Sequence, residues 1–229
     1  MWKMDKIYFN YKSPDDISTM IADKTGATVY NVGFGGAQMS ETSNAKYDAF
    51  GMENLADAIT TGDFSLQENY CTKENRFTAP FNTLKSIDFN SVDIITIAYG
   101  TNDFVKGNSL EMIRNAAKYS IETIKNKYPN IDIVLCIPVY RYWIDDEGNF
   151  IEDSNTKEIN GIKLTDYIQL YKEIGKEYGL VVIDNYNDCG INFTSKDHCF
   201  TGTDTTHPNK VGRQMIAENM SKVLYENFG

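Results

Sequence analysis

The stretch VDIITIAYGTND, residues 92–103, decides the fold of this 229-residue chain. Residues 92–98 are almost continuously apolar and rich in β-branched side chains, as in a strand that is covered on both faces. Small and polar residues follow at once, and they place the amide of Asn102 where the strand ends. This arrangement predicts a buried parallel strand whose carboxyl end opens onto a turn.

Four further runs of the same kind lie along the chain: KIYFNY (6–11), TVYNVG (28–33), IDIVLCIPV (131–139) and LVVID (180–184). Helical spacing of apolar residues marks 15–25, 109–128, 164–178 and 209–227. Strands that alternate with helices indicate an α/β fold with a parallel sheet covered on both sides. We therefore expect one domain over residues 1–229, with a five-stranded sheet and long connections at 37–91 and 140–163.

The charge balance restricts the partners of the chain. It carries 22 basic and 32 acidic residues, which gives a net charge of −10, and no run of Lys and Arg forms a basic patch. Nucleic acid and anionic membrane surfaces are therefore poor candidates. No apolar run approaches the roughly 20 residues that span a bilayer. The first residues lack the apolar core of a signal peptide, so we expect a cytoplasmic protein, or a secreted one if a leader precedes this chain.

The four cysteines, Cys71, Cys136, Cys189 and Cys199, match no zinc-binding spacing. Cys136 lies in an apolar run and is expected to be a buried thiol. Cys189 and Cys199 are candidates for a disulfide in an oxidising compartment.

Polar or glycine-rich segments follow three of the expected strands: NVGFGG (31–36), YGTND (99–103) and DTTHP (204–208). Ligands of open α/β sheets bind beyond the carboxyl ends of the strands, so these segments are the first places to look for a site. Asn102 can donate an N–H to a developing oxyanion. Each segment also has a plain structural interpretation, because glycines form tight turns and Asn and Asp cap helices.

His207 is one of only two histidines, and it lies three residues after Asp204 and directly before Pro208. Proline is common at the first position of a helix, so Asp204 to Pro208 can be a cap followed by a helix start. Alternatively, the Asp204 carboxylate holds the imidazole of His207 in one tautomer and stabilises it when it accepts a proton. His198 lies in a polar segment and is expected to be a surface residue.

Taken together and in this order, NVGFGG, GTND and DTTHPN resemble blocks II, III and V of the SGNH hydrolases, the GDSL lipase/acylhydrolase family. The resemblance spans nearly the whole chain. It implies a flavodoxin-like α/β/α sandwich and a serine esterase that needs no metal or cofactor. By motif match, Gly36 supplies a backbone donor and Asn102 a side-chain donor to the oxyanion, and Gly100 shapes the second turn. His207 is then the general base and Asp204 its partner.

The chain departs from the family at the nucleophile, because no Gly-Asp-Ser occurs anywhere in it. If the first expected strand is aligned with the family's first block, Ser13 takes the place of the serine, and Tyr11 and Lys12 replace Gly and Asp. Pro14 then restricts Ser13 to extended backbone, which opposes the family's turn into a helix. In a second alignment, residues 13–26 follow the nucleophile and the block itself is missing. Ser18 and Ser40 are weaker candidates than Ser13.

These observations leave three functions open. The first is an esterase for small acyl groups, with acetyl groups on carbohydrate as the leading substrate and Tyr140, Tyr142 and Trp143 as residues that line a sugar cleft. The second is an inactive relative that binds a ligand without cleaving it. The third is a flavodoxin-type binding domain, which the absence of a phosphate-loop pattern disfavours.

Overall fold

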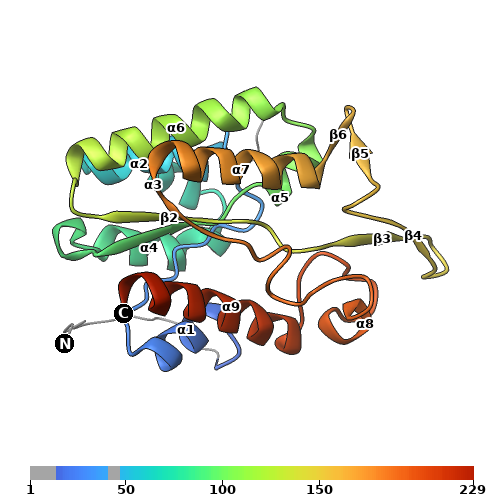
Figure 1. Cartoon of the computed structure of the whole chain (residues 1–229). Helices are drawn as coiled ribbons and strands as arrows, with labels where there is room; N and C mark the ends of the chain where they lie inside the picture. The colour runs from blue at the N-terminus through green and yellow to red at the C-terminus, as the bar shows by residue number, and fades with distance from the viewer. Residues whose placement is uncertain (1–13, 41–46) are drawn as a thin grey trace.

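A parallel sheet forms the centre of the computed structural model, which describes residues 14–40 and 47–229 (Figure 1). Its strands are β1 (Ile94–Ile97), β2 (Asp132–Cys136) and β7 (Val181–Ile183), in the order β1-β2-β7. Ile94 pairs with Asp132, and Val134 pairs with Val181. Three of the five expected strands are therefore confirmed, all in parallel.

The central strand β2 shows why these apolar runs are nearly continuous. Ile133 and Leu135 belong to one buried cluster, and the alternate residues Val134 and Cys136 belong to another. Successive side chains of a strand point to opposite faces, so a strand covered on both faces needs apolar residues at every position. Directly after the strand, the N–H of Ile137 donates to the carbonyl of Ile183 at the end of β7.

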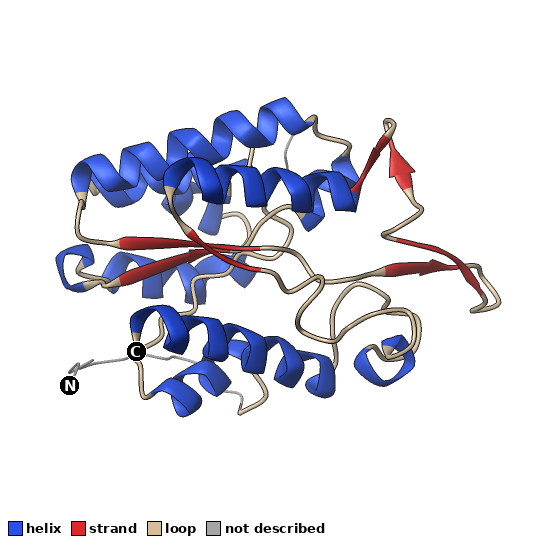
Figure 2. Ribbon diagram, in the orientation of Figure 1, coloured by secondary structure: helices blue, strands red, loops and turns tan. Residues whose placement is uncertain are grey.

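Helices cover both faces of the sheet, which makes an α/β/α sandwich (Figure 2). One layer contains α2 (Met52–Thr61), α6 (Leu110–Lys127) and α7 (Leu164–Tyr178), and the other contains α1 (Ile17–Thr25) and α9 (Lys210–Phe228). The helices expected at 15–25, 109–128, 164–178 and 209–227 are confirmed within two residues at each end. The Ser109 hydroxyl caps α6 by accepting the N–H of Met112.

The expected long connection at 37–91 is mostly helical in its described part. Besides α2 it contains α3 (Ser65–Cys71), α4 (Thr78–Ser86) and the short 3-10 helices Asp48–Phe50, Asn75–Phe77 and Phe89–Ser91. In α2 the buried residues recur at helical spacing, a local signal that the sequence prediction missed. The shorter elements are held by an aromatic cluster in which the ring centroids of Phe34 and Phe50 lie 4.1 Å apart, so they depend on tertiary packing.

The strand expected at 28–33 is wrong, since the described residues contain an extended loop there. Val29 packs into the cluster between the sheet and α9, and Val32 packs into the aromatic cluster. The side chains are thus used for packing, but the backbone pairs with no strand in the described ranges. The strand expected at 6–11 lies outside the described residues.

The elements that follow the strands gather at one end of the sheet, on the right in Figure 1. They are α5 (Thr101–Lys106), the hairpin of β3 (Tyr142–Ile144) and β4 (Phe150–Asp153), the hairpin of β5 (Glu158–Ile159) and β6 (Ile162–Lys163), and α8 (Lys196–Cys199). The expected loop at 140–163 is therefore two small hairpins. This carboxyl end of the sheet carries the polar segments singled out in the sequence.

Candidate active site

Asp204 and His207 form a direct contact in the loop between α8 and α9. The Nδ1 atom of His207 lies 3.0 Å from Oδ2 of Asp204 and 3.2 Å from Oδ1. Oδ1 also accepts the backbone N–H groups of Thr206 at 3.0 Å and of His207 at 2.9 Å. The three-residue spacing therefore lets one carboxylate fix both the turn and the ring.

The contact assigns the proton of the neutral imidazole to Nδ1, which leaves Nε2 as a free acceptor. The His207 side chain is 83% exposed, so Nε2 is open to a ligand. Burial opposes ionisation of Asp204, but the hydrogen bonds from the N–H groups of His207 and Thr206 outweigh it and lower the pKa of that carboxyl. An ionised carboxylate beside Nδ1 can stabilise an imidazolium.

Asp204 does not cap the last helix, so the interpretation of Asp204 as a helix cap is wrong. The cap of α9 is Asn209, whose Oδ1 accepts the N–H groups of Val211 and Gly212. Its Nδ2 donates to the carbonyls of His198 and Phe200. Because Asn209 serves the helix, the carboxylate of Asp204 is available to the histidine.

The glycine turn and the Gly-Thr-Asn-Asp segment also meet. Nδ2 of Asn102 donates to the carbonyl of Ala37 at 2.9 Å. The amide has a second N–H, for which the described residues give no acceptor. Asn102 thus lies beside the turn that contains Gly36, as an oxyanion site built from these two residues requires.

Asp103 also connects these two segments by hydrogen bonds. Its fully buried carboxylate accepts the N–H groups of Met39 (2.9 Å) and Ser40 (3.2 Å) and the hydroxyl of Ser40 (3.1 Å). Nδ2 of Asn108 donates to it at 3.1 Å. Burial raises the pKa of Asp103, although the hydrogen bonds from Met39 and Ser40 oppose the rise. The sequence did not reveal this role, because Met39 and Ser40 lie more than 60 positions away from Asp103.

Two glycines in these segments, Gly36 and Gly100, have positive φ and close neighbours. Gly36 has a φ of +91°, and a Cβ there would lie 2.6 Å from Cε2 of Tyr47. Gly100 has a φ of +115° and caps α5, and a Cβ there would lie 3.2 Å from Cγ of Pro138. Backbone with positive φ favours glycine.

A chain of side-chain contacts connects the Asn102 segment to the His207 loop. Phe104 packs edge-on against Trp143, with centroids 6.1 Å apart. The guanidinium of Arg141 lies 4.7 Å from the centre of the Trp143 ring and donates to Oγ1 of Thr206 at 2.8 Å. The connection after β2 therefore links both halves of the candidate site, and nothing in the sequence pattern singled out Arg141.

The predicted serines have different outcomes. Ser13 lies outside the described residues. Ser40 is buried and held by Asp103, and the hydroxyl of Ser18 is buried in α1. Neither of these two hydroxyls is open to an ester.

Three other expectations can be compared with the structure. Tyr140 and Tyr142 are buried, so they pack in the core and do not line an open cleft, whereas Trp143 is half-buried. All four cysteines lie in the described ranges and are free thiols, so Cys189 and Cys199 are not paired. Cys136 is buried as expected, and burial raises the pKa of its thiol to about 12.

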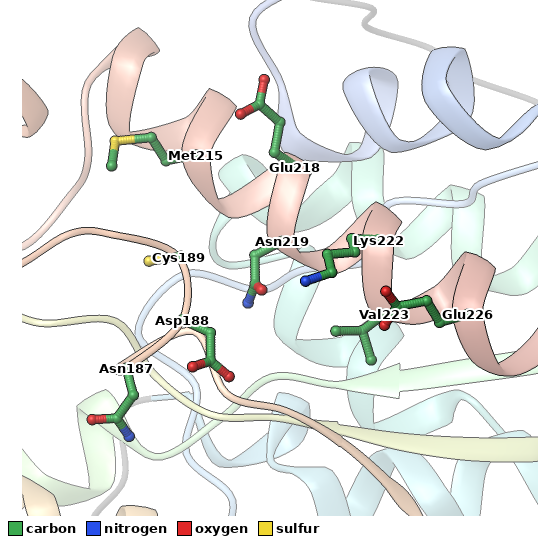
Figure 3. A pocket seen from close by; sticks show the side chains of 9 residues that line it. All are labelled: Asn187, Asp188, Cys189, Met215, Glu218, Asn219, Lys222, Val223 and Glu226. Atoms are coloured by element: carbon green, nitrogen blue, oxygen red, sulfur yellow. The ribbon is translucent and has the colours of Figure 1, made fainter.

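A pocket of about 750 Å³ lies between α9 and the segment that follows β7 (Figure 3). Figure 3 shows Asn219 and Lys222 extending from α9 toward that segment, which carries Asn187 and Asp188. The pocket is lined by none of the residues predicted for the site. It is therefore separate from the Asp204–His207 pair.

An α/β/α sandwich with an aspartate–histidine pair beyond the carboxyl ends of its strands is the architecture of the SGNH-type hydrolases. The chain belongs to the GDSL-like lipase/acylhydrolase family, whose sequence profile matches residues 8–215. Family membership supports ester hydrolysis as the general class of chemistry.

Solved structures agree on the fold. A carbohydrate acetylesterase from Sinorhizobium meliloti, Est24, is 14% identical, with a TM-score of 0.61 over 95% of this chain and 88% of that one. A protein from Lactobacillus plantarum is 17% identical, with a TM-score of 0.62 over 96% and 92% of the two chains. A comparison with curated protein sequences found no match. Within the described ranges, no helix has the length and apolar character that crossing a bilayer requires.

Proposed function

We propose that this protein hydrolyses small acyl esters, with acetyl groups on carbohydrate as the leading substrate class. His207 acts as the general base and Asp204 orients it. Asn102 and the N–H of Gly36 hold the oxyanion, and Ser13 is the candidate nucleophile. The family match and the similarity to a carbohydrate acetylesterase support the reaction class and the substrate class.

The observation that carries the proposal is the 3.0 Å contact between Nδ1 of His207 and Oδ2 of Asp204, with the ring 83% exposed. A histidine held in this way has Nε2 directed away from its partner, which is the atom that must accept a proton from a serine or from water. A histidine that only begins a helix has no need of this contact, since Asn209 supplies the cap.

These groups account for each bond change and each proton transfer of the reaction. Oγ of the serine forms a bond to the ester carbonyl while its proton moves to Nε2 of His207. The oxyanion then collapses, the carbon–oxygen bond to the alcohol breaks, and the alcohol leaves with the proton from His207. Water repeats the sequence on the acyl-enzyme and releases the acid. No cofactor enters any step.

A second candidate function is ligand binding without turnover. The observation that favours it is the sequence itself, which contains Asp204, His207 and Asn102 but no Gly-Asp-Ser. Such a chain retains an oxyanion site and a base, and these groups give slow hydrolysis through water even without a nucleophile.

The decisive experiment is incubation with a fluorophosphonate, followed by intact-mass analysis and peptide mapping. One stoichiometric adduct on Ser13 that disappears in H207A supports the esterase with Ser13 as its nucleophile. An adduct on a different serine retains the esterase and rejects Ser13. A folded protein with no adduct and no turnover of p-nitrophenyl acetate or acetylated sugars rejects the esterase in favour of a binding protein.

A further inference from the structure

Arg141 is a buried cation that belongs to neither motif of the candidate site. It lies in the connection between β2 and β3, and only 8% of the residue is exposed. Its N–H donates to Oγ of Ser154 at 3.3 Å, and its carbonyl accepts the N–H of Ser154 at 3.0 Å. The backbone of Arg141 is thus fixed to the turn that follows β4.

The side chain of Arg141 reaches from this fixed position to the loop that contains Asp204 and His207. Nη2 donates to Oγ1 of Thr206 at 2.8 Å, one residue before His207. The N–H of Tyr142 donates to the carbonyl of Thr205 at 3.4 Å, which adds a weaker link to the same loop. Trp143 covers the guanidinium plane at 4.7 Å. Arg141 therefore has little freedom to move relative to the loop.

No carboxylate in the described ranges forms an ion pair with Arg141, and its Nε has no acceptor there. The other cations around the loop do have partners. They are Lys196 with Asp197, Lys210 with Asp15, and Arg213 with the carbonyls of Asp15 and Pro208. Burial of an unpaired charge is unfavourable, and burial lowers the pKa of Arg141 while the charge of Asp204 opposes that change. The charges of Arg141 and Asp204 therefore attract each other.

We propose that Arg141 is a positioning residue for this pair, through its hydrogen bond to Thr206 and through the attraction of its charge to the carboxylate of Asp204. The hydrogen bond fixes the loop that presents the ring. The charge favours the ionised form of Asp204, which is the form that accepts the hydrogen bond from Nδ1 of His207. This inference rests on the proposed function for its catalytic consequence, but its physical basis is independent of turnover.

The two contributions can be separated by substitution. T206V removes the acceptor on the loop and leaves the charge in place. R141M removes the hydrogen bond and the charge together, and R141K retains the charge with a different geometry. The comparison therefore distinguishes a charge effect from a purely structural one.

The first test is an NMR titration of the aspartate side-chain carboxyl carbons, which needs no enzymatic activity. D204N assigns the signal of Asp204. In R141M we expect the midpoint of the Asp204 titration to rise by roughly half a pH unit or more, because the charge that favours the carboxylate is removed. In T206V and R141K it should stay within about 0.2 units of the parent, because the charge remains. An unchanged or lower midpoint in folded R141M overturns the inference.

The second test follows the loop itself. In T206V the backbone order parameter of the His207 amide should fall, and an unchanged value overturns the positioning role even if R141M does not fold. If the chain is an esterase, T206V should lower kcat by about tenfold at constant KM, an effect typical of a displaced base. A raised midpoint in a protein that cleaves no ester supports this inference and rejects the proposed function. Ester turnover with an unchanged midpoint in R141M supports the proposed function and rejects this inference.

Discussion

Two aspartates, Asp103 in α5 and Asp204 in the loop between α8 and α9, show how burial decides what a carboxylate does. Asp103 is fully buried, accepts hydrogen bonds from Met39, Ser40 and Asn108, and has a raised pKa because burial opposes its charge. The side chain of Asp204 is half exposed, holds His207, and has a lowered pKa because its hydrogen bonds outweigh burial. The first carboxylate joins two segments, and the second is available to assist chemistry.

The largest effect that tests this comparison is on turnover. If the exposed pair performs catalysis, H207A should reduce kcat for p-nitrophenyl acetate by roughly 10³-fold or more, because no other group would accept the proton. H198Q is the matched control and should retain the parent rate. The free energy of unfolding of H207A should change by less than about 0.5 kcal/mol, as for other exposed sites. A parent-like rate in H207A would remove His207 from the mechanism.

Substitution of the buried Asp103 should affect stability rather than turnover. D103A leaves the buried N–H groups of Met39 and Ser40 without an acceptor, so we expect it to lower the free energy of unfolding by about 2–4 kcal/mol. Chemical denaturation measures this, with D146A, an exposed aspartate in the β3–β4 hairpin, as the control. A loss in D103A no larger than in D146A would show that the buried network contributes little.

Gly36 tests the turn that Asp103 holds in place. G36A must adopt a φ of +91° and displace the ring of Tyr47, so we expect a loss of about 1–3 kcal/mol. The adjacent G35A is the control, because a Cβ at that position meets no atom within 4 Å. Thermal unfolding of the two variants separates the effects. Equal stability of G36A and G35A would contradict the geometry of this turn.

The smallest expected effect is the pH dependence of stability, and its sign differs between the two carboxylates. The pKa of Asp204 is lower in the folded state, so its ionised form stabilises the fold above about pH 4, and this contribution is lost as the pH falls through the folded pKa. The pKa of Asp103 is higher in the folded state, so ionisation of Asp103 costs stability as the pH rises above about 4.

Denaturation of the parent, D204N and D103N between pH 3 and pH 7 checks these signs. D204N should have a lower free energy of unfolding than the parent at neutral pH, and this difference should become smaller toward pH 3. The free energy of unfolding of D103N should increase relative to that of the parent as the pH rises. Opposite trends would mean that the two environments have been assigned wrongly.

Much of the fold could be predicted from the sequence because the relevant signals are local. The strands at 94–97, 132–136 and 181–183 are short apolar runs, and the helices at 110–127 and 164–178 have regular apolar spacing. The contact between Asp204 and His207 was also predictable, since three residues of chain bring the two side chains together. The family resemblance added Asn102 and Gly36 as partners, and in the structure Asn102 donates to the carbonyl of Ala37, the residue after Gly36.

Only the tertiary structure decided the rest, because those features depend on residues far apart in the chain. The run at 28–33 looks like a strand, but its valines pack against two clusters and its backbone finds no partner in the described ranges. The short helices at 65–71 and 78–86 depend on an aromatic cluster whose members lie far apart in the chain. Asp103 meets Met39 across 64 positions, and Arg141 meets Thr206 across 65. Hydrogen bonds within a turn are set by the local chain, whereas the partners of a buried charge are set by how the layers pack.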